Sequence, residues 1–458
     1  MRSETNLRVP GWAARGGSAR GYIAPHARPD RGGRGREHAL AWKLRRDDPT
    51  LELIAAPGNP GIAELAECVP IAVGDLAALE QLARERTVDL TVVGPEAPLA
   101  AGIVDRFRAA GLPVFGPTRA AAEIETSKAF AKHLMVEAGV PTARAEIHTR
   151  VADARAAARR FGAPVVVKAS GLAAGKGVIV CRSLDEADRA IDDMLEGNRF
   201  GAAGAEVVVE EFMEGEELSV FAITNGTDFV LLPGLQDHKR LLDGDRGPNT
   251  GGMGAYLPVG LATADVEAEV SRIVRRTLDA LHAQGRPFTG LLYAGLMLTS
   301  DGAKVVEFNC RFGDPETQAL MPVLDVDPPL LALMSAAARD EPLPRTAGRT
   351  SGACITTVVA AAGYPEAPRT GDPITLPDTT SETVIFQAGT ARDAAGRLVT
   401  AGGRVLAVSA VAPTIADAHR ASLRAAERVR FAGSHHRSDI GWRELARHAS
   451  VDAGAAGD

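Results

Sequence analysis

Three polar side chains stand at alternate positions in the segment 304–311, which reads KVVEFNCR. Because successive strand residues point to opposite faces, a strand here would have one polar and one apolar face. The polar face would carry Val305, Glu307, Asn309 and Arg311, and the apolar face Val306, Phe308 and Cys310. Carboxylate and amide oxygens suit magnesium, and a guanidinium can neutralise a transferring phosphoryl group. A strand with one solvated face alternates in the same way, so the pattern alone leaves both interpretations open.

Composition limits the class of protein. The 458 residues are enough for about three domains, and 45% hydrophobic residues support packed cores. A net charge of -7 argues against nucleic acid as the main partner, and no apolar run reaches the roughly 18 residues of a membrane span. The cysteines are far apart and form no CxxC pair, which disfavours a zinc site or disulfide framework and favours a reducing cytoplasm; they are Cys68, Cys181, Cys310 and Cys354.

The two ends of the chain differ from the rest. Residues 1–34 are rich in Arg and Gly, contain three prolines and have no regular apolar pattern. We expect this segment to be disordered or non-native. Residues 446–458 are rich in Ala and Gly, and we expect a frayed tail there.

Residues 35–125 alternate helical and strand patterns. Expected helices cover 37–44 and 75–85, and expected strands cover 51–56 and 89–94, each strand ending in a Gly/Pro turn. This order is typical of a Rossmann-like parallel sheet with its site at the carboxyl ends of the strands. The segment carries no good dinucleotide fingerprint.

A helix expected over 128–137 leads into a glycine-rich hairpin. A strand at 164–168 runs into GLAAGKG, residues 171–177, and a second strand follows at 178–180. The backbone N–H groups of such a flap can approach phosphates. The spacing is not that of a P-loop, because Gly177 stands where Ser or Thr is required, and an ordinary tight turn remains an alternative.

The later segments combine charged loops with strands. Carboxylates stand at the junction of two expected strands, one over 206–212 and one starting at 216. Further along, the charged segment QDHKR (236–240) precedes the glycine-rich loop GPNTGGMG (247–254). That loop is either a mobile surface loop or an anion-binding loop. The strand expected at 293–298 has no carboxylate, so we expect fewer protein ligands for a metal. Residues 349–445 read as a small α+β domain, with strands at 353–361, 384–389 and 404–411 and a helix at 415–431.

Several long sequence motifs resemble those of one protein family. EFNCRFGDPETQ (307–318) resembles the metal-binding strand of the ATP-grasp ligases, specifically the phosphoribosylamine–glycine ligase family. REHALAWKL, APGNPG, VGPEAPL, FGPT, QDHKR and GPNTGGMGAY match the same family in the same order, over about residues 36–443. The resemblance implies an α/β and α+β multidomain protein. A Rossmann-like domain precedes an ATP-grasp domain over 126–348, with a lid at about 145–210, and a small α+β cap domain follows.

The resemblance also implies roles for individual residues. It assigns the catalytic step to Asp237, Lys239 and Arg311 and a Mg²⁺ or Mn²⁺ ion to Glu307 and Asn309. ATP would be held by Lys128, Lys168, Gly175, Lys176, Gly177, Glu210, Glu211, Phe212, Met213 and Glu217. The other substrates would be held by Gly35, Arg36, Glu37, Asn249, Thr250, Gly251, Gly252 and Asp314.

The implied reaction is the ATP-dependent ligation of glycine to 5-phosphoribosylamine through glycyl phosphate, in purine biosynthesis. It yields glycinamide ribonucleotide, ADP and phosphate. We expect a cytoplasmic monomer whose partners are these small molecules, with no nucleic acid and no membrane. Two alternatives stay open: another ATP-grasp carboxylate–amine ligase, and an ATP-binding protein with impaired ligase activity.

The second alternative arises from the start of the chain. Relatives open with a short apolar strand followed by GxGGREHA, whereas Arg34 stands here where glycine is expected, and residues 24–31 contain no β-branched side chain. The likeness begins abruptly at Gly35, as a shifted reading frame upstream would produce. We therefore expect the chain to lack its central first strand, to be less stable than relatives, and to bind phosphoribosylamine poorly while retaining ATP binding.

Overall fold

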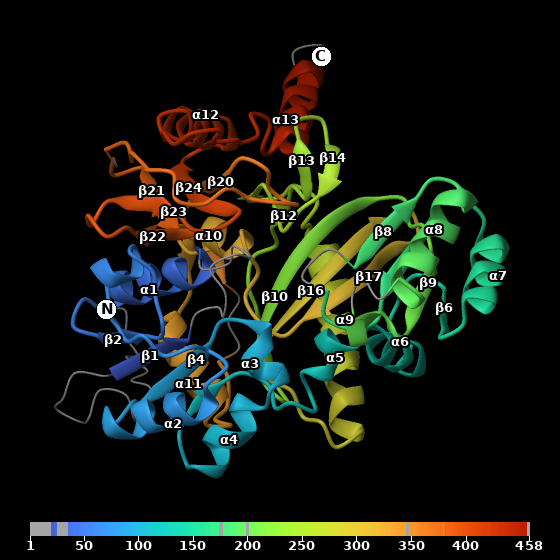
Figure 1. Ribbon diagram of the computed structural model, residues 1–458, viewed down its shortest axis with the longest axis horizontal. Helices are drawn as coiled ribbons and strands as arrows, with labels where there is room; N and C mark the ends of the chain where they lie inside the picture. The colour runs from blue at the N-terminus through green and yellow to red at the C-terminus, as the bar shows by residue number, and fades with distance from the viewer. Residues whose placement is uncertain are drawn as a thin grey trace, which may run out of the picture.

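The computed structural model describes residues 20–24, 35–173, 177–197, 201–344, 348–378 and 380–455. Figure 1 shows the N-terminal region at the lower left, the C-terminal region above it, and a side module of strands and helices at the right. Within the described residues no helix combines the length and apolar character needed to cross a membrane.

The N-terminal region is a parallel sheet in the order β3-β2-β1-β4-β5 with helices around it. Its strands over Glu52–Ala55 and Leu90–Val93 are mostly buried, as expected of strands covered on both faces. Its elements are β1 (Arg20–Ala24), α1 (Gly35–Asp47), β2 (Glu52–Ala55), the 3₁₀ helix η2 (Ile62–Glu64), β3 (Glu67–Cys68), α2 (Leu76–Glu85), β4 (Leu90–Val93), α3 (Glu96–Ala100), α4 (Ile103–Ala109) and β5 (Val114–Phe115).

Strand β1 corrects an expectation from the sequence. The chain does not lack its central first strand: β1 pairs in parallel with both β2 and β4. Residues 20–24, RGYIA, lie upstream of the segment 24–31 whose composition disfavoured a strand. The expectation failed because it rested on residues 24–31, whereas the strand ends at Ala24 and contains the strand-favouring residues Tyr22 and Ile23. The rest of residues 1–34 lies outside the described residues.

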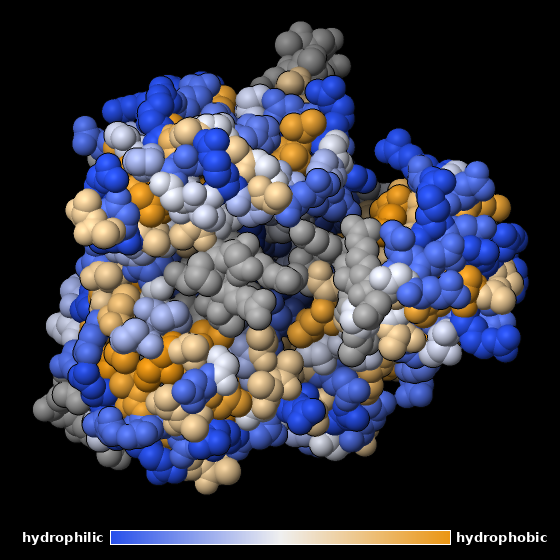
Figure 2. Space-filling model, viewed as in Figure 1, coloured by the Kyte–Doolittle hydropathy of each residue, from blue (hydrophilic) through white to orange (hydrophobic). Residues whose placement is uncertain are grey.

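The side module is a four-stranded sheet in the order β6-β9-β7-β8 with two helices. It occupies the segment expected to form the lid, and a small core of its own joins the helices to the sheet. In Figure 2 its exposed surface is mainly hydrophilic. Its elements are β6 (Ala145–His148), α7 (Val151–Phe161), β7 (Val165–Ala169), β8 (Val178–Cys181), α8 (Leu184–Leu195), the 3₁₀ helix η3 (Gly201–Gly204) and β9 (Val207–Glu211).

The central region contains an antiparallel sheet in the order β11-β10-β16-β17. Its strands are β10 (Glu216–Asn225), β11 (Phe229–Leu231), β16 (Thr289–Thr299) and β17 (Gly302–Asn309). The helices of this region are α5 (Glu123–Thr126), α6 (Lys128–Glu137), α9 (Ala264–Ala283), α10 (Glu316–Leu320) and α11 (Leu330–Ala338). Helix α6 has the bounds expected from the sequence, and Ser127 caps it by accepting the Phe130 N–H.

A β-bulge in β17 changes which side chains share a face. Gly295 pairs with Glu307, and the next residue, Leu296, pairs with Val305. Val306 is therefore an extra residue in β17, and it reverses the alternation before that point. The expectation that Val305 shares the face of Glu307 is wrong, since Val305 is buried in the core with Leu296.

One sheet joins the central and C-terminal regions, in the order β12-β15-β20-β24-β21. Strands β12 (Gln236–Asp237) and β15 (Gly254–Leu257) precede the boundary expected at 348, and β20 (Ala353–Ala360), β21 (Thr383–Gln387) and β24 (Arg404–Ala412) follow it. The described residues also form three two-stranded sheets: β13 (Arg240–Leu242) with β14 (Arg246–Asn249), β18 (Leu324–Asp325) with β19 (Arg349–Thr350), and β22 (Thr390–Arg392) with β23 (Leu398–Thr400).

The last two helices differ from the expected bounds. Helix α12 (Ile415–Ala426) ends earlier than predicted. The expected frayed tail over 446–458 is wrong for most of its length, because α13 (Trp442–Ala455) continues through it. The start of α13 is held by side-chain contacts, since Glu444 accepts the Gly260 N–H at 3.0 Å and pairs with Arg447.

Candidate functional site

The expected metal residues lie on β17 beyond the bulge, on its polar face. Glu307 is opposite Gly295 and Asn309 is opposite Tyr293. Asn309 Oδ1 accepts a hydrogen bond from Arg311 at 3.2 Å. Two oxygen donors on one strand fit Mg²⁺, which binds through one or two protein groups and completes its shell with phosphate and water. The described residues contain no cluster of three or more His, Cys, Asp and Glu side chains suited to a metal.

Cations surround Glu307. Burial raises the pKa of Glu307, but Lys239, Lys168, Lys128 and Arg311 outweigh it, so the net pKa lies below its usual range. Burial lowers the pKa of Lys128. The carboxylate is therefore ionised at neutral pH, as a metal ligand must be.

Glu210, at the end of β9, lies between two lysines. Its carboxylate is 3.0 Å from Lys132 Nζ and 2.8 Å from Lys168 Nζ, and the residue is 3% exposed. Lys168 also donates to Val306 O in the bulge at 3.1 Å. Sequence reasoning missed Lys132, although its position four residues after Lys128 places both on one face of α6.

The other expected nucleotide residues lie near the junction of β9 and β10. Glu211 accepts from Arg144 Nε at 2.6 Å, Phe212 is exposed and Met213 is half-buried. Glu217 pairs with Lys239. Gly177 closes the turn between β7 and β8 through a 2.8 Å hydrogen bond from Ala169 N to Gly177 O; Gly175 and Lys176 lie outside the described residues.

Asp237 and Lys239 flank His238 at the edge of the shared sheet. Asp237 is buried, and its Oδ1 has no hydrogen-bond partner within the described residues. Burial raises the pKa of Asp237 to about 8, with Lys239 opposing the shift. Burial lowers the pKa of Lys239, but Glu217 and Asp237 outweigh it and hold that pKa well above its usual value. Asp237 is therefore poised to exchange a proton near neutral pH.

Arg36 and Asp314 join the N-terminal region to the loop after β17. Arg36 NH1 donates to Phe312 O at 2.8 Å, its N–H donates to Asp314 Oδ2 at 3.2 Å, and its Nε lies 3.0 Å from Glu37. Gly35 lies so close to Gln318 Nε2 that a Cβ would be 2.4 Å away. These expected substrate residues are thus brought together at a tight contact between two regions.

Arg404, which the sequence did not single out, reaches the same place from β24. Its NH1 donates to Gly251 O at 2.5 Å and to Asp314 O at 2.6 Å, and it lies 3.2 Å from Asp314 Oδ1. Burial raises the pKa of Asp314, but Arg404 and Arg36 outweigh it and lower the net pKa. No local motif marks Arg404, because its partners lie about 90 and 150 residues earlier in the chain.

The glycine loop after β14 is closed by backbone hydrogen bonds. Thr250 N and Oγ1 both donate to Lys239 O at 2.8 Å. Gly251 N donates to the Tyr364 hydroxyl at 3.0 Å. Gly252 has a positive φ of 108°, and a Cβ there would lie 2.5 Å from Pro315, so only glycine fits. Asn249 pairs with Arg240 at the base of the hairpin.

Arg311 meets carboxylates from the N-terminal side. Its Nε is 3.5 Å from Glu96, and its NH2 is 3.3 Å from Glu125. Glu125 also accepts the Cys310 N–H at 2.7 Å. Burial raises the pKa of Glu125, with Arg311 opposing the shift. Sequence reasoning did not assign Glu125, whose position shortly before α6 carries no recognisable signal.

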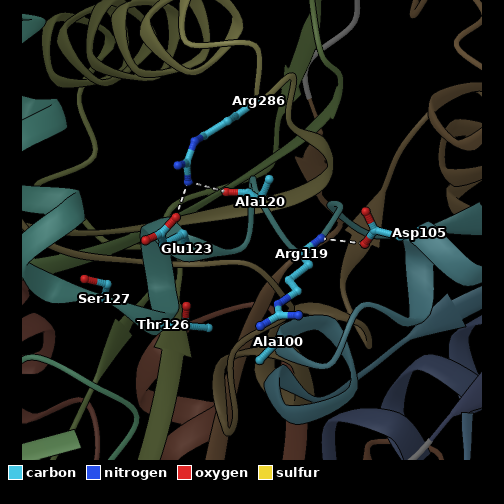
Figure 3. Close-up of a pocket in the computed structure, with 8 residues that line it drawn as sticks. All are labelled: Ala100, Asp105, Arg119, Ala120, Glu123, Thr126, Ser127 and Arg286. Carbon is cyan, nitrogen blue, oxygen red and sulfur yellow. Dashed lines mark hydrogen bonds and ion pairs between the residues drawn. The ribbon is translucent and has the colours of Figure 1, made fainter.

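A separate pocket of about 520 Å³ lies between the N-terminal region and the start of β16 (Figure 3). Arg286 in it donates to Ala120 O at 3.1 Å and pairs with Glu123, and Arg119 N donates to Asp105 at 2.7 Å. None of its lining residues is an expected site residue; they are Ala100, Asp105, Arg119, Ala120, Glu123, Thr126, Ser127 and Arg286. The convergence of charged groups at β17 is therefore a better candidate for the chemistry than this pocket.

Comparisons with known proteins agree along the chain. Three models of the phosphoribosylglycinamide synthetase family match: the N domain at residues 32–125, the ATP-grasp (A) domain at 126–317 and the C domain at 354–443. A phosphoribosylamine–glycine ligase of Xanthomonas campestris pv. campestris is 50% identical over 92% of this chain and 99% of its own length. The enzyme of the same name from Ralstonia nicotianae is 49% identical over 91% of this chain and 99% of its own length.

Solved structures give the same fold. The phosphoribosylamine–glycine ligase of Thermotoga maritima has a TM-score of 0.80 and 34% identity, covering 92% of this chain and all of its own. The biotin carboxylase domain of Hydrogenobacter thermophilus 2-oxoglutarate carboxylase, solved with MgADP, has a TM-score of 0.67 at 17% identity and covers 91% of each chain. The second likeness concerns the fold alone. The multidomain ATP-grasp fold class expected from the sequence is confirmed.

Proposed function

Because the chain belongs to the phosphoribosylglycinamide synthetase family, we propose that it ligates glycine to 5-phosphoribosylamine with ATP in purine biosynthesis. One observation carries the proposal from the geometry: the oxygen donors Glu307 and Asn309 lie among several cations, beside Arg311. This arrangement suits the transfer of a phosphoryl group, whose charge must be neutralised in fixed positions.

The nucleotide would bind between the side module and the central sheet. Lys128, Lys168 and the β7–β8 turn, including Gly175, Lys176 and Gly177, would contact its phosphates. The chain from Glu210 to Met213 would hold the adenine, and Glu217 the ribose. Lysine suits the phosphates because its ammonium group is a compact charge on a flexible stem. Lys168 would exchange part of its contact with Glu210 for phosphate oxygens.

Glu307 and Asn309 would hold Mg²⁺ or Mn²⁺. When bound, such an ion neutralises phosphate charge and orients the oxygens. Arg311 would stabilise the γ-phosphoryl group as it moves to the glycine carboxylate. Transfer is needed because a carboxylate is a poor electrophile, whereas the resulting acyl phosphate has a good leaving group. Both metal-binding residues lie on rigid strand β17, which keeps them in fixed register.

The amine of phosphoribosylamine would then attack the acyl phosphate. The loop residues Asn249 to Gly252 with Lys239 would position the acyl group, and Gly35 to Glu37 with Asp314 would hold the phosphoribosyl end. Asp237 would take the proton released by the amine, which its unpartnered oxygen and its pKa near 8 both favour. Exclusion of water from this step would limit hydrolysis of the intermediate.

Measurement of ADP release with ATP, glycine and freshly generated phosphoribosylamine tests the function, each compound being omitted in turn. We expect release only when all three are present. Equal release without glycine would disprove the ligation, and turnover with a different acid or amine would favour another ATP-grasp ligase. ATP binding without any turnover would favour the impaired nucleotide-binding protein.

Two further properties belong to the proposal. We expect a monomer, which light scattering during gel filtration would measure, and a cytoplasmic location, which fractionation of cells would measure. Comparison of turnover with Mg²⁺ and Mn²⁺ as the only divalent cation would decide the metal.

A further inference from the structure

The loop between Asp237 and Gly252 projects as the hairpin β13–β14 beside the start of α13 (Figure 1). Its tip, residues 243–245, is bonded to a C-terminal segment, residues 435–443, which we call the clasp. Ser438 N and Oγ donate to the two oxygens of Asp243 at 2.9 and 2.5 Å. Gly244 N donates to Asp439 Oδ2 at 2.8 Å. The clasp itself is anchored to β20, where His435 and Ala360 exchange backbone hydrogen bonds.

Arg437 is the centre of the clasp. It is fully buried, at 0% exposure, and all three of its guanidinium nitrogens donate hydrogen bonds. Nε and NH2 form a fork on the two Asp439 oxygens at 2.7 and 2.8 Å. NH1 donates to Arg240 O at 3.0 Å and to Asp245 Oδ1 at 2.9 Å. One guanidinium therefore ties the base of the hairpin, its tip and the clasp together.

Asp245 and His238 extend this connection to the site. Asp245 has a φ of 53°, an unfavourable left-handed conformation that lets its carboxylate reach both Arg437 and Arg443. His238 Nδ1 lies 3.6 Å from Asp245, and His238 Nε2 accepts the Gly441 N–H at 2.9 Å. The acceptor role fixes the neutral tautomer with the proton on Nδ1, facing Asp245. His238 lies directly between Asp237 and Lys239.

We propose that the clasp positions the substrate loop for ligation, with Arg437 as the positioning residue. It acts through Asp245, His238 and the hairpin, and it touches none of the reacting groups. The inference rests on the proposed role of residues 237–252 in binding glycine and the amine substrate. Apart from Glu217, which pairs with Lys239, the groups proposed to hold ATP lie on α6, on β7 and around β9, so loosening the clasp should weaken glycine and amine binding with a much smaller effect on ATP binding.

The test uses the full-length chain with Arg437→Met and Arg437→Lys. The matched control is Arg397→Met, because Arg397 Nε and NH2 also contact one aspartate, through Asp393 Oδ2, but on the exposed turn between β22 and β23. We expect Arg437→Met to raise the KM for glycine or phosphoribosylamine about tenfold and to leave the KM for ATP within about twofold. Arg437→Lys should show a smaller effect, since it keeps the charge without the fork. Arg397→Met should change neither KM.

Hydrogen exchange separates positioning from general stability. Amides of residues 240–250 should exchange faster in Arg437→Met, whereas those of β17 should not. If Arg437→Met does not fold, Ser438→Ala serves instead, because Ser438 is exposed and its hydroxyl, among the described residues, donates to Asp243 at the tip. Ser438→Ala should raise the KM for glycine or phosphoribosylamine about two- to threefold and leave the KM for ATP unchanged.

Comparison with Asn249→Ala distinguishes failure of the clasp inference from failure of the proposed function. Asn249→Ala alters the loop directly. If Asn249→Ala raises a substrate KM and the clasp variants do not, the clasp inference is wrong and the loop assignment stands. If the clasp variants raise the KM values for ATP and glycine equally, Arg437 is only structural. If Asn249→Ala is also without effect, the proposed loop role is wrong, and the clasp inference fails with it.

Discussion

Lysines approach buried carboxylates on the nucleotide side of the candidate site, and arginines tie regions of the chain together on the substrate side. On the nucleotide side Lys132 and Lys168 approach Glu210, and Lys128 contributes to the charge around Glu307. On the substrate side Arg36 and Arg404 tie the loop after β17 to the N-terminal and C-terminal regions.

The difference follows from the geometry of the two cations. An ammonium group can exchange a carboxylate for a phosphate oxygen with little reorientation, whereas a guanidinium fixes the direction of several bonds at once. The lysine side is therefore suited to a ligand that enters and leaves. The arginine side is suited to holding the regions in one arrangement.

The largest expected effect is on the arginine side. Arg311→Met removes a partner from Glu125, which is buried beside β17, and should lower the free energy of unfolding by about 3–5 kcal/mol. Denaturant unfolding measures this loss. The comparison predicts a smaller loss for Lys128→Met, and equal losses for the two variants would contradict it.

The second largest effect is expected from acid, which should weaken the contact between the N-terminal and C-terminal regions on the arginine side. His38 in α1 accepts the Gln387 N–H of β21 at 2.9 Å. Burial lowers the pKa of His38 to about 4. Because the folded pKa lies below the unfolded value, the stability contribution is present above pH 6.5 and is lost as pH falls from 6.5 towards 4. The loss reaches about 3 kcal/mol.

Unfolding at a series of pH values measures this contribution of His38. His38→Asn is the matched variant, because an amide oxygen can accept the same N–H without titrating. Its stability should fall less between pH 6.5 and 4 than that of the parent chain. A parallel fall in both proteins would show that other groups cause the acid sensitivity.

Glu307→Gln should affect rate rather than stability. Loss of one charged ligand should reduce kcat about 100-fold, or about 2.7 kcal/mol, because the remaining oxygen donors bind a cation weakly. Phe308→Ala on the opposite face should do the reverse, lowering stability through a cavity in the core. Wild-type turnover of Glu307→Gln at limiting magnesium would exclude the metal assignment.

The smallest effect is expected for Lys132→Met. Without Lys132, Glu210 would attract Lys168 alone and hold it away from the phosphates, so the KM for ATP should rise about three- to tenfold. Lys304→Met is the control, because Lys304, on β17, pairs with exposed Asp301. An unchanged KM in Lys132→Met would place Lys168 outside the nucleotide site.

Local signals predicted much of the fold. Helix α6 matched its expected bounds because Ser127 provides a cap and Gly139 follows the last turn with a positive φ of 62°. The bulge at Val306 has no such signal, since an extra residue in β17 is defined only by the pairing with β16. Strand β1 was missed for a different reason, because its strand-favouring residues Tyr22 and Ile23 stand in a segment otherwise rich in Arg, Gly and Pro.

The candidate site divides in the same way. Glu307, Asn309 and Arg311 were proposed from alternation and resemblance, and their roles remain predictions. Lys132 could have been found from helical spacing. Arg404 could not, because it meets Asp314 only after the C-terminal region has folded onto the central one. Side chains that join regions leave no periodic pattern in the sequence.

The shared sheet affects the order in which the chain can fold during synthesis. Strand β15 pairs with β20, and Gly254 is opposite Thr357, so roughly a hundred residues must be made after β15 before its partner exists. Until then the nascent chain presents an open strand edge, which favours contact with chaperones or with other nascent chains. Slow translation between residues 260 and 350 would therefore prolong the period in which this polypeptide is prone to aggregate.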